Sequence, residues 1–476
     1  MEVEEVLRRI GFGGAQKRLY ILIQTIHYAS VSHFIALSFI GFEPQWTCGD
    51  KTELDAKCLE YARGDCKPHY LEDVSTIISE WNLLCDKSSL AKLSQSIFFS
   101  GAMLGAWLWG TLADRIGRRK IYFTTVVLTA AMGLGYSVAP NYYIFVVFRF
   151  LVALSVTGLI LSSYVLSIEL TGTQGRTKIV MLSNAFYSLC HPLLATQAYL
   201  ITDWRLFSSV SSLSGLLVLL LWRVIPESPR WLLVNGQQEE ARAVLARLAS
   251  DNGVEMPAGE LKKPTDPTSA EPVSVLDLFR GKVIRRRTVI LFVTWFANCL
   301  VYYALTMSAG ELGGNRYVNI ALAGLVEIPS YIAGYFLLDS IGRKRLHGVF
   351  LTSGGIACLA VACMQWFGYD NRLIMTSVAL FGKLAVSGSF VCIYMYSAEL
   401  FPTQVRNIGA GVATIGARLG GFFAPIVLLL VGYGVGLPML VLGSVGTLTG
   451  LLSFTLPETL GQPMPETLRE LECQKF

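Results

Sequence analysis

Two stretches in opposite halves of the chain are nearly identical. SIELTGTQGRT begins at Ser167 and SAELFPTQVRN begins at Ser397, an offset of about 230 residues. DRIGRRK at Asp114 recurs as DSIGRKR at Asp339, and PES at Pro226 recurs as PET at Pro457. A period near half of 476 residues indicates two copies of one unit. In a membrane, a doubled unit usually forms a pathway between its halves, because polar groups can leave the lipid there.

The composition indicates a membrane protein. Apolar residues make up 53% of the chain and charged residues only 15%, which is outside the range of soluble globular proteins. Apolar segments long enough to cross a hydrocarbon core of ~30 Å recur along the chain. We expect an all-α membrane protein with twelve transmembrane helices in two pseudo-symmetric six-helix halves. The segments centre near Ser30, Ala102, Ala130, Leu154, Leu189, Leu216, Cys299, Gly324, Ala357, Leu384, Gly416 and Ser444.

Lysine and arginine in short loops predict the orientation, because such loops stay on the cytoplasmic side. Both copies of the DRIGRRK loop are strongly basic, so both termini should be cytoplasmic. No cleavable leader is evident before the first apolar segment. The predicted parts are the N-terminus 1–19, a first half 20–225, a central cytoplasmic loop 226–288, a second half 289–456, and the C-terminus 457–476. Within the central loop, WLLVNGQQEEARAVLARLA predicts an amphipathic interfacial helix, and KKPTDPTSAEP predicts a flexible linker.

Four of the ten cysteines share the polar outer loop 43–88. A cluster of four in a loop that faces outward predicts two disulfides, with three connectivities open for Cys48, Cys58, Cys66 and Cys85. A zinc site is the alternative, but no cysteine pair has the tight spacing that zinc sites usually show. The loop favours a plasma membrane that faces an oxidising exterior.

The motif GTLADRIGRRK, from Gly110 to Lys120, resembles the hallmark loop of the major facilitator superfamily. SEWNLLCDKSSL, PESPRWLL, ELFPTQVRNIGAG and LPETLGQPMPET resemble the organic ion transporter family, which comprises organic cation, organic anion and carnitine transporters. The resemblance implies the major facilitator fold and transport by alternating access. It also implies gating by charged residues, with Arg149 and Lys383 pairing with Glu169 and Glu399. The predicted gating residues are Asp114, Arg115, Arg118, Arg119, Asp339, Arg343, Arg149, Glu169, Glu399, Lys383 and Arg406.

Ionisable residues inside apolar segments are functional candidates, because they are costly in a bilayer. Glu327 and Arg418 are the two strongest, and an ion pair between them is the structural alternative. A guanidinium can hold a carboxylate with two parallel hydrogen bonds, so we expect Arg418 to bind an anionic group. By the resemblance, cation transporters carry an acid at the position of Arg418, whereas anion and carnitine transporters carry arginine. Together with Glu327, this pattern is similar to the carnitine-type branch, whose substrates are zwitterions, while Ser330 replaces a lysine that many anion transporters carry.

Aromatic side chains complete the predicted substrate site. Trp295 and Tyr302 are seven residues apart and share a helical face. Ring faces could hold a quaternary ammonium or the apolar body of a substrate. The predicted binding residues are Arg418, Glu327, Tyr187, Trp295, Tyr302, Tyr303, Phe390 and Tyr394. His27 and His33 fit either buried hydrogen bonding or a proton-linked role.

These features predict a polyspecific secondary transporter for zwitterions or organic anions. The alternatives are an organic cation transporter that uses Glu327 and the aromatic residues, and a non-transporting receptor or scaffold with the same fold. The sequence has no catalytic constellation and no Gly-rich ATP-binding loop, so we expect no enzyme and no resident cofactor or metal. Coupling to Na⁺, H⁺ or a counter-substrate stays open, and the expected partners are a small organic ion and the lipid membrane, without nucleic acid.

Overall fold

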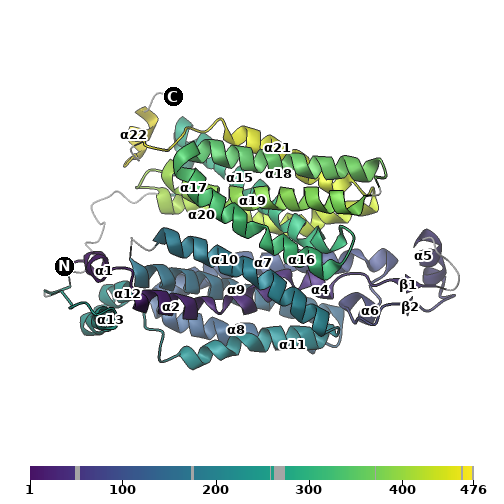
Figure 1. Ribbon diagram of the computed structural model, residues 1–476, viewed down its shortest axis with the longest axis horizontal. Coiled ribbons are helices and arrows are strands. Elements are labelled where there is room, and N and C mark those ends of the chain that lie inside the picture. The colour runs from purple at the N-terminus through teal and green to yellow at the C-terminus, as the bar shows by residue number, and fades with distance from the viewer. Residues whose placement is uncertain are drawn as a thin grey trace.

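The structure is a computed structural model that describes residues 1–48, 54–172, 176–257, 259–261, 274–369, 371–462 and 465–473. Gln174 of the first repeat copy and the predicted linker 262–272 lie outside these residues. The helices form two elongated bundles that lie side by side (Figure 1). Both termini lie at one end of the bundles, which we call the termini end, and the cysteine-bearing loop lies at the opposite end, which we call the disulfide end.

The first half contains a broken first helix and five longer helical segments. Two breaks, at Thr25–Ile26 and at Ala36, divide the first apolar segment into three short helices, α2, α3 and α4. The bounds are α1 Val3–Ile10, α2 Gly14–Gln24, α3 His27–Ile35, α4 Leu37–Ile40, α7 Ser89–Ile116, α8 Arg118–Ser137, α9 Tyr142–Thr171, α10 Arg176–Leu200, α11 Trp204–Ser214 and η3 Gly215–Leu221.

The second half also contains six helical segments, but its first helix, α15, is unbroken. Its second segment is divided into α16 and α17 next to Glu327. The bounds are α15 Lys282–Ser308, η4 Ala309–Glu311, α16 Arg316–Leu325, α17 Glu327–Ile341, α18 Arg343–Trp366, α19 Arg372–Leu400, α20 Arg406–Leu428, η5 Leu429–Gly432 and α21 Leu437–Ser453.

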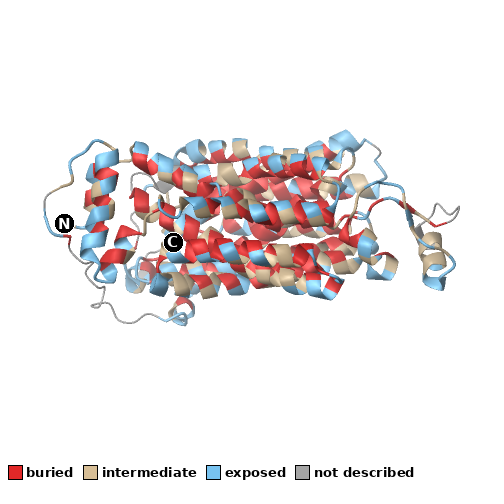
Figure 2. Ribbon diagram, turned by 90° about the horizontal axis from the view of Figure 1, so that it is seen from below, coloured by how far each residue is buried: buried red, intermediate tan, exposed pale blue. Residues whose placement is uncertain are grey.

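All twelve predicted segment centres lie in helical segments. Among the described residues, eight continuous helical runs are long and apolar enough to cross a membrane, and α21 is a shorter apolar helix. Buried residues gather between the helices, whereas exposed residues lie on the outer faces and in the end loops (Figure 2). The predicted all-α membrane architecture is therefore confirmed.

The packing follows the repeat. In the first half, α9 packs against α7 and α8, and in the second half, α19 packs against α17 and α18. Between the halves, α10 lies against α16 and α17, and α7 lies against α20. A side chain at Gly420 would meet the backbone of Phe296 and Leu300, so glycine at this position lets α20 approach α15 closely.

The outer loop is a small disulfide-bonded unit. Its strands β1 (Trp46–Thr47) and β2 (His69–Tyr70) pair antiparallel, and α5 (Leu54–Arg63) lies between them in the chain. Of the three open connectivities, the structure contains Cys48–Cys66 and Cys58–Cys85. All four cysteines are therefore used in cross-links, which leaves no thiolate for the alternative zinc site.

The predicted amphipathic helix of the central loop differs from the observed structure. It is divided into α12 (Pro229–Val234) and α13 (Gln238–Asp251), because Gly236 between them has a φ of 80°. The apolar side of α13 packs on α1 and α2. Arg242 and Arg247 are exposed as expected, but the apolar face is covered by protein and is not free to lie in lipid.

Candidate functional site

Glu327 and Lys383 form a buried ion pair in the second half. Lys383 Nζ lies 2.9 Å from Glu327 Oε1, and the two side chains are 2% and 0% exposed. Glu327 Oε2 also accepts hydrogen bonds from Ser188 Oγ at 2.7 Å and from Tyr331 OH at 2.9 Å. Lys383 Nζ further donates to Thr306 Oγ1 and lies 3.2 Å from the centre of the Tyr302 ring. The charge of Glu327 is thus compensated within the protein.

This pairing excludes one alternative and corrects one prediction. Glu327 does not pair with Arg418, and Lys383 does not pair with Glu399. Lys383 and Glu399 both lie on α19, about 16 residues or ~24 Å apart along the helix axis, so one side chain cannot reach the other.

Arg149 likewise does not pair with Glu169, because the two lie about 20 residues apart on α9, or ~30 Å along its axis. Arg149 is fully buried and donates to the His33 carbonyl oxygen at 2.9 Å and to Gln95 Oε1 at 2.5 Å. Its guanidinium lies 4.4 Å from the centre of the Phe98 ring. Gln95 also donates to the carbonyl oxygen of Phe34, at 2.9 Å. These carbonyls lie beside the break between α3 and α4, so Arg149 and Gln95 stabilise that break.

Arg418 lies on α20, half-buried. In the described part of the chain, no carboxylate lies within ion-pairing distance of its guanidinium. Its charge interacts with the Cys299 thiol and with the hydroxyl groups of Tyr303 and Tyr394. A cation near aromatic side chains, with no acidic partner among the described residues, is suited to hold an anionic ligand.

The predicted aromatic residues form one connected cluster. Trp295 and Tyr302 both contact Phe390, with ring centres 5.7 Å and 5.2 Å apart, which confirms that they share a helical face. Trp295 also contacts Tyr394 at 4.6 Å. Tyr303 packs on Tyr302 at 5.3 Å and on Phe99 at 4.7 Å, and Phe99 comes from the first half.

Tyr187 of α10, in the first half, also lies beside the aromatic cluster. It interacts electrostatically with Tyr303 and Glu327, and its ring centre lies 5.4 Å from that of His191. Tyr394 interacts with Tyr164 of α9, yet these two side chains are 51% and 39% exposed. These two tyrosines thus come from opposite halves, and neither side chain is fully buried.

Five contributors to the site were not predicted from the sequence: Ser188, Tyr331 and Thr306 at the ion pair, and Phe99 and Tyr164 at the aromatic cluster. Tyr331 could have been found, because it lies one helical turn after Glu327 and on the same face. By the same argument, Thr306 lies one turn after the predicted Tyr302, and Ser188 directly follows Tyr187, whereas Phe99 and Tyr164 reach the site only through packing between helices.

Two matching charge clusters lie at the termini end. Arg118 binds Asp114 at 2.8 Å and Glu169 at 3.3 Å. The equivalent Arg343 binds Asp339 at 3.0 Å and Glu399 at 3.2 Å. Each cluster joins helices of its own half, so these ion pairs do not tie the two halves together here. Their gating role stays a prediction.

The repeated acids of PES and PET support the same turns. Glu227 accepts the backbone N–H of Arg119, and Glu458 accepts that of Arg343, both at 2.9 Å. Burial opposes ionisation of Glu458, but backbone N–H donors outweigh it and lower its pKa. From the sequence, these acids are recognisable only as part of the repeat.

The other predicted gating residues have separate surroundings. Arg119 lies 4.3 Å from the centre of the Trp222 ring, and Arg406 donates to Thr403 Oγ1 at 3.2 Å. Arg115 is exposed.

At the disulfide end the halves are in direct contact. The Arg316 guanidinium of α16 lies 3.7 Å from the centre of the Phe42 ring and donates to the Ser38 carbonyl oxygen at 3.4 Å. Lys92 Nζ of α7 donates to the Leu428 carbonyl oxygen at 3.3 Å. We call these contacts the disulfide-end clasp.

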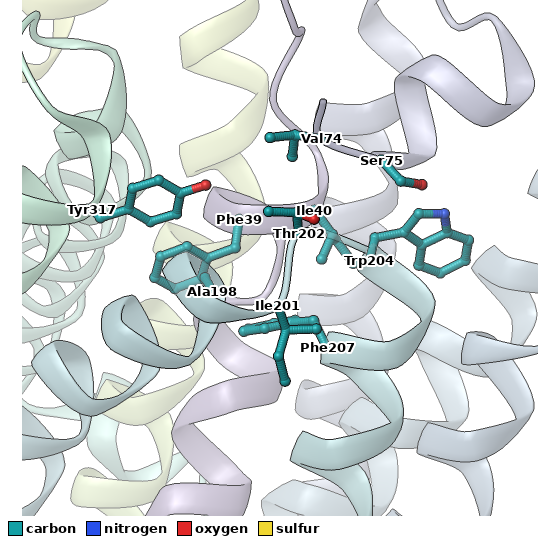
Figure 3. Close-up of a pocket in the computed structure, with 10 residues that line it drawn as sticks. All are labelled: Phe39, Ile40, Val74, Ser75, Ala198, Ile201, Thr202, Trp204, Phe207 and Tyr317. Atoms are coloured by element: carbon teal, nitrogen blue, oxygen red, sulfur yellow. The ribbon is translucent and has the colours of Figure 1, made fainter. Parts of the chain in front are cut away.

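A small pocket beside the clasp is mostly apolar, with Tyr317 of the second half facing residues of the first (Figure 3). Among the described residues, one group could bring three metal-ligating side chains together, namely Cys48, Glu60 and Cys66. Both cysteines are disulfide-bonded, so the group offers no thiolate to a metal.

The fold is that of the major facilitator transporters. The inward open conformation of the xylose transporter XylE from E. coli superposes with a TM-score of 0.70, at 18% identity, over 96% of this chain and 99% of that one. The family described as "Sugar (and other) transporter" matches residues 50–471.

Relatives narrow the class further. The Xenopus laevis protein "Solute carrier family 22 member 15-like" is 36% identical over 100% of this chain and 97% of its own length. The human "Organic cation/carnitine transporter 2" is 33% identical over 93% of this chain and 79% of its own length. This chain belongs to solute carrier family 22, the organic ion transporters, and is a multi-pass membrane transporter.

Proposed function

We propose that this protein carries small organic ions with a carboxylate, zwitterionic or anionic, across the plasma membrane by alternating access between its halves. The observation that supports this proposal most strongly is the different surroundings of Glu327 and Arg418. Glu327 is neutralised by Lys383, whereas Arg418 has no carboxylate within ion-pairing distance among the described residues. Arg418, Lys383 and Glu327 together carry one net positive charge, which favours a ligand with a free carboxylate.

Each part of the site has a distinct role in this proposal. The Arg418 guanidinium holds the carboxylate through two parallel hydrogen bonds. The cluster of Trp295, Tyr302 and Phe390 covers the apolar body or a quaternary ammonium group by area burial and cation–π attraction. The name of the human relative, "Organic cation/carnitine transporter 2", supports a zwitterion as one substrate class.

The alternative of a pure cation transporter has less support. It needs Glu327 to attract the substrate, but Lys383 lies 2.9 Å from that carboxylate. A cation at this position would have to displace a buried lysine.

The basic loops support the proposed orientation. The loop with Arg115, Arg118 and Arg119 contacts α12 at the termini end (Figure 1), because Trp231 Nε1 donates to the Asp114 carbonyl oxygen. The Arg343 backbone N–H binds Glu458, in the segment that leads to α22 (Leu468–Cys473) at the same end. The positive-inside rule puts this end in the cytoplasm. Disulfides persist in oxidising surroundings, which puts the disulfide end outside the cell.

The test is uptake of three labelled compounds: carnitine, a dicarboxylate, and a quaternary ammonium ion without a carboxylate. Hydrogen bonds to charged groups contribute ~1.5–3 kcal/mol, so Arg418→Gln should lower the uptake efficiency of carboxylate substrates about 10- to 150-fold. The matched control is Arg372→Gln, because Arg372 is an exposed arginine at the start of α19.

Uptake of the three compounds tests both the role of Arg418 and the substrate class. Loss of carnitine and dicarboxylate uptake in Arg418→Gln, with the control unchanged, supports the proposal. Preference of the wild type for carnitine over the dicarboxylate identifies zwitterions as the class. Unchanged carboxylate uptake in Arg418→Gln, with normal surface expression, would falsify the assignment of Arg418.

A further inference from the structure

His191 is a fully buried side chain at the contact between the halves. It precedes Pro192 inside α10, and the missing proline N–H leaves the Ser188 carbonyl without its helical donor. The His191 Nδ1 atom lies 3.2 Å from the neighbouring Tyr187 carbonyl oxygen. A carbonyl can only accept, so Nδ1 carries the proton. Nε2 is then a free acceptor, and it is buried without a hydrogen-bond partner among the described residues.

Gly324 of α16 faces this ring from the other half. A Cβ atom at Gly324 would lie 2.6 Å from His191 Cγ. The absence of a side chain there lets α16 close over His191. The contact between the halves therefore shields the ring from solvent, and separation of α10 from α16 would expose it to water.

The charged neighbours of His191 are Glu327 of α17 and Lys383 of α19, which both interact with the ring. On α10 itself, the Tyr187 ring lies 5.4 Å from the His191 ring. Five further titratable groups on the neighbouring elements have contacts of their own. Tyr20 of α2 binds Ser183, Tyr28 of α3 binds Gln197, Tyr331 of α17 binds Glu327, Arg149 of α9 binds His33 and Gln95, and Arg316 of α16 lies in the clasp. His27 and His33 of α3 are buried as well.

A proton on Nε2 would put a net positive charge into this cluster, since Glu327 and Lys383 already neutralise each other. Burial of an additional charge is costly unless it gains a partner. The closed disulfide end therefore excludes the protonated ring, whereas an open, hydrated end accepts it. By linkage, acid on that side favours the open state.

We propose that His191 is a proton-binding site that makes opening of the disulfide end depend on pH. The inference rests on the alternating access of the proposed function, but not on the identity of the substrate. It assigns His191 a role different from those of Arg418 and the aromatic cluster, which contact the substrate. His191 acts through the contact between α10 and α16.

The test measures opening directly, without substrate. Ser38 lines the closed end beside the clasp, so Ser38→Cys reports opening by its reaction with a membrane-impermeant thiol reagent. Tyr369 is 47% exposed in the loop after α18, and Tyr369→Cys serves as a reference that cancels the pH dependence of the reagent. Both are made with Cys363→Ser, which removes a native exposed thiol.

From pH 8 to pH 6, the ratio of Ser38→Cys to Tyr369→Cys labelling should rise at least threefold in total. One proton limits the rise to about tenfold per pH unit. His191→Gln should remove the dependence, and His191→Asn is a second variant in case glutamine prevents folding. His27→Gln, at another buried histidine in the same half, should keep it.

A ratio that is flat in the wild type, or one that still rises in a folded His191 variant, would overturn the proposal. Loss of the rise in His27→Gln as well would also overturn it, because the effect would then not belong to His191. None of these results depends on carboxylate binding by Arg418, so the two proposals can fail separately.

Discussion

Removal of one member of the Glu327–Lys383 pair should destabilise the protein far more than removal of both. The two charges lie 2.9 Å apart with almost no exposure. At an effective dielectric constant of ~20, their attraction is about 6 kcal/mol. Loss of one partner leaves a buried, unpaired charge, and such losses cost about 3–5 kcal/mol.

The assay is a double-mutant cycle of unfolding in detergent, with wild type, Glu327→Gln, Lys383→Met and the double variant. We expect each single variant to lose about 3–5 kcal/mol. The double variant should lose at least ~2 kcal/mol less than the sum of the two, because it buries no unpaired charge. The matched control is the Arg280–Asp277 pair, at 2.7 Å but with side chains 74% and 18% exposed. Its coupling should stay below about 1 kcal/mol.

Additive losses at Glu327 and Lys383 would refute this reasoning. They would mean that each charge has another partner, or that water reaches the pair. Either result would also weaken the argument that Glu327 is unavailable to a cationic substrate.

Two further predictions concern the ends of the bundles. Gly117→Ala should lower stability by about 1–3 kcal/mol, because Gly117 has a φ of 115° and a side chain there would meet the Glu227 carboxylate. Gly411→Ala is the matched control, because Gly411 lies within α20 and no atom lies within 4 Å of the new Cβ. It should raise stability by up to ~1 kcal/mol. If the unfolding midpoints of Gly117→Ala and Gly411→Ala shift in the same direction, this prediction is wrong. Arg316→Ala removes a cation–π contact of ~1–2 kcal/mol from the clasp. In this background, Ser38→Cys should react with the membrane-impermeant thiol reagent about five to thirty times faster. An unchanged labelling rate would show that Arg316 does not hold this end closed.

The sequence predicts the architecture well because its signals are local. Apolar runs report which segments can enter lipid, and each predicted centre lies in a helical segment. The repeated motifs predict equivalent turns, and Arg118 and Arg343 indeed make the same pair of contacts. The shared helical face of Trp295 and Tyr302 followed from their spacing alone.

The partners of buried charges could not be predicted in the same way. The predicted pairs Lys383–Glu399 and Arg149–Glu169 rest on the family resemblance, and their separations of about 16 and about 20 residues along a single helix exclude both. Nothing in a linear sequence shows that α19 brings Lys383 to the level of Glu327. Likewise, the break between α3 and α4 supplies the carbonyls near Arg149, and a break of this kind depends on its tertiary neighbours.

By itself, then, the sequence determined the membrane class, the duplication, the family and the two unusual charges, Glu327 and Arg418. These are properties of composition and of residues close together in the chain. Only the tertiary structure decided which charge is compensated, because Ser188, Glu327 and Lys383 meet through the packing of α10, α17 and α19. Of the two charges, that packing pairs Glu327 and leaves Arg418 without a carboxylate partner in the described part of the chain, and it buries His191 at the contact between the halves.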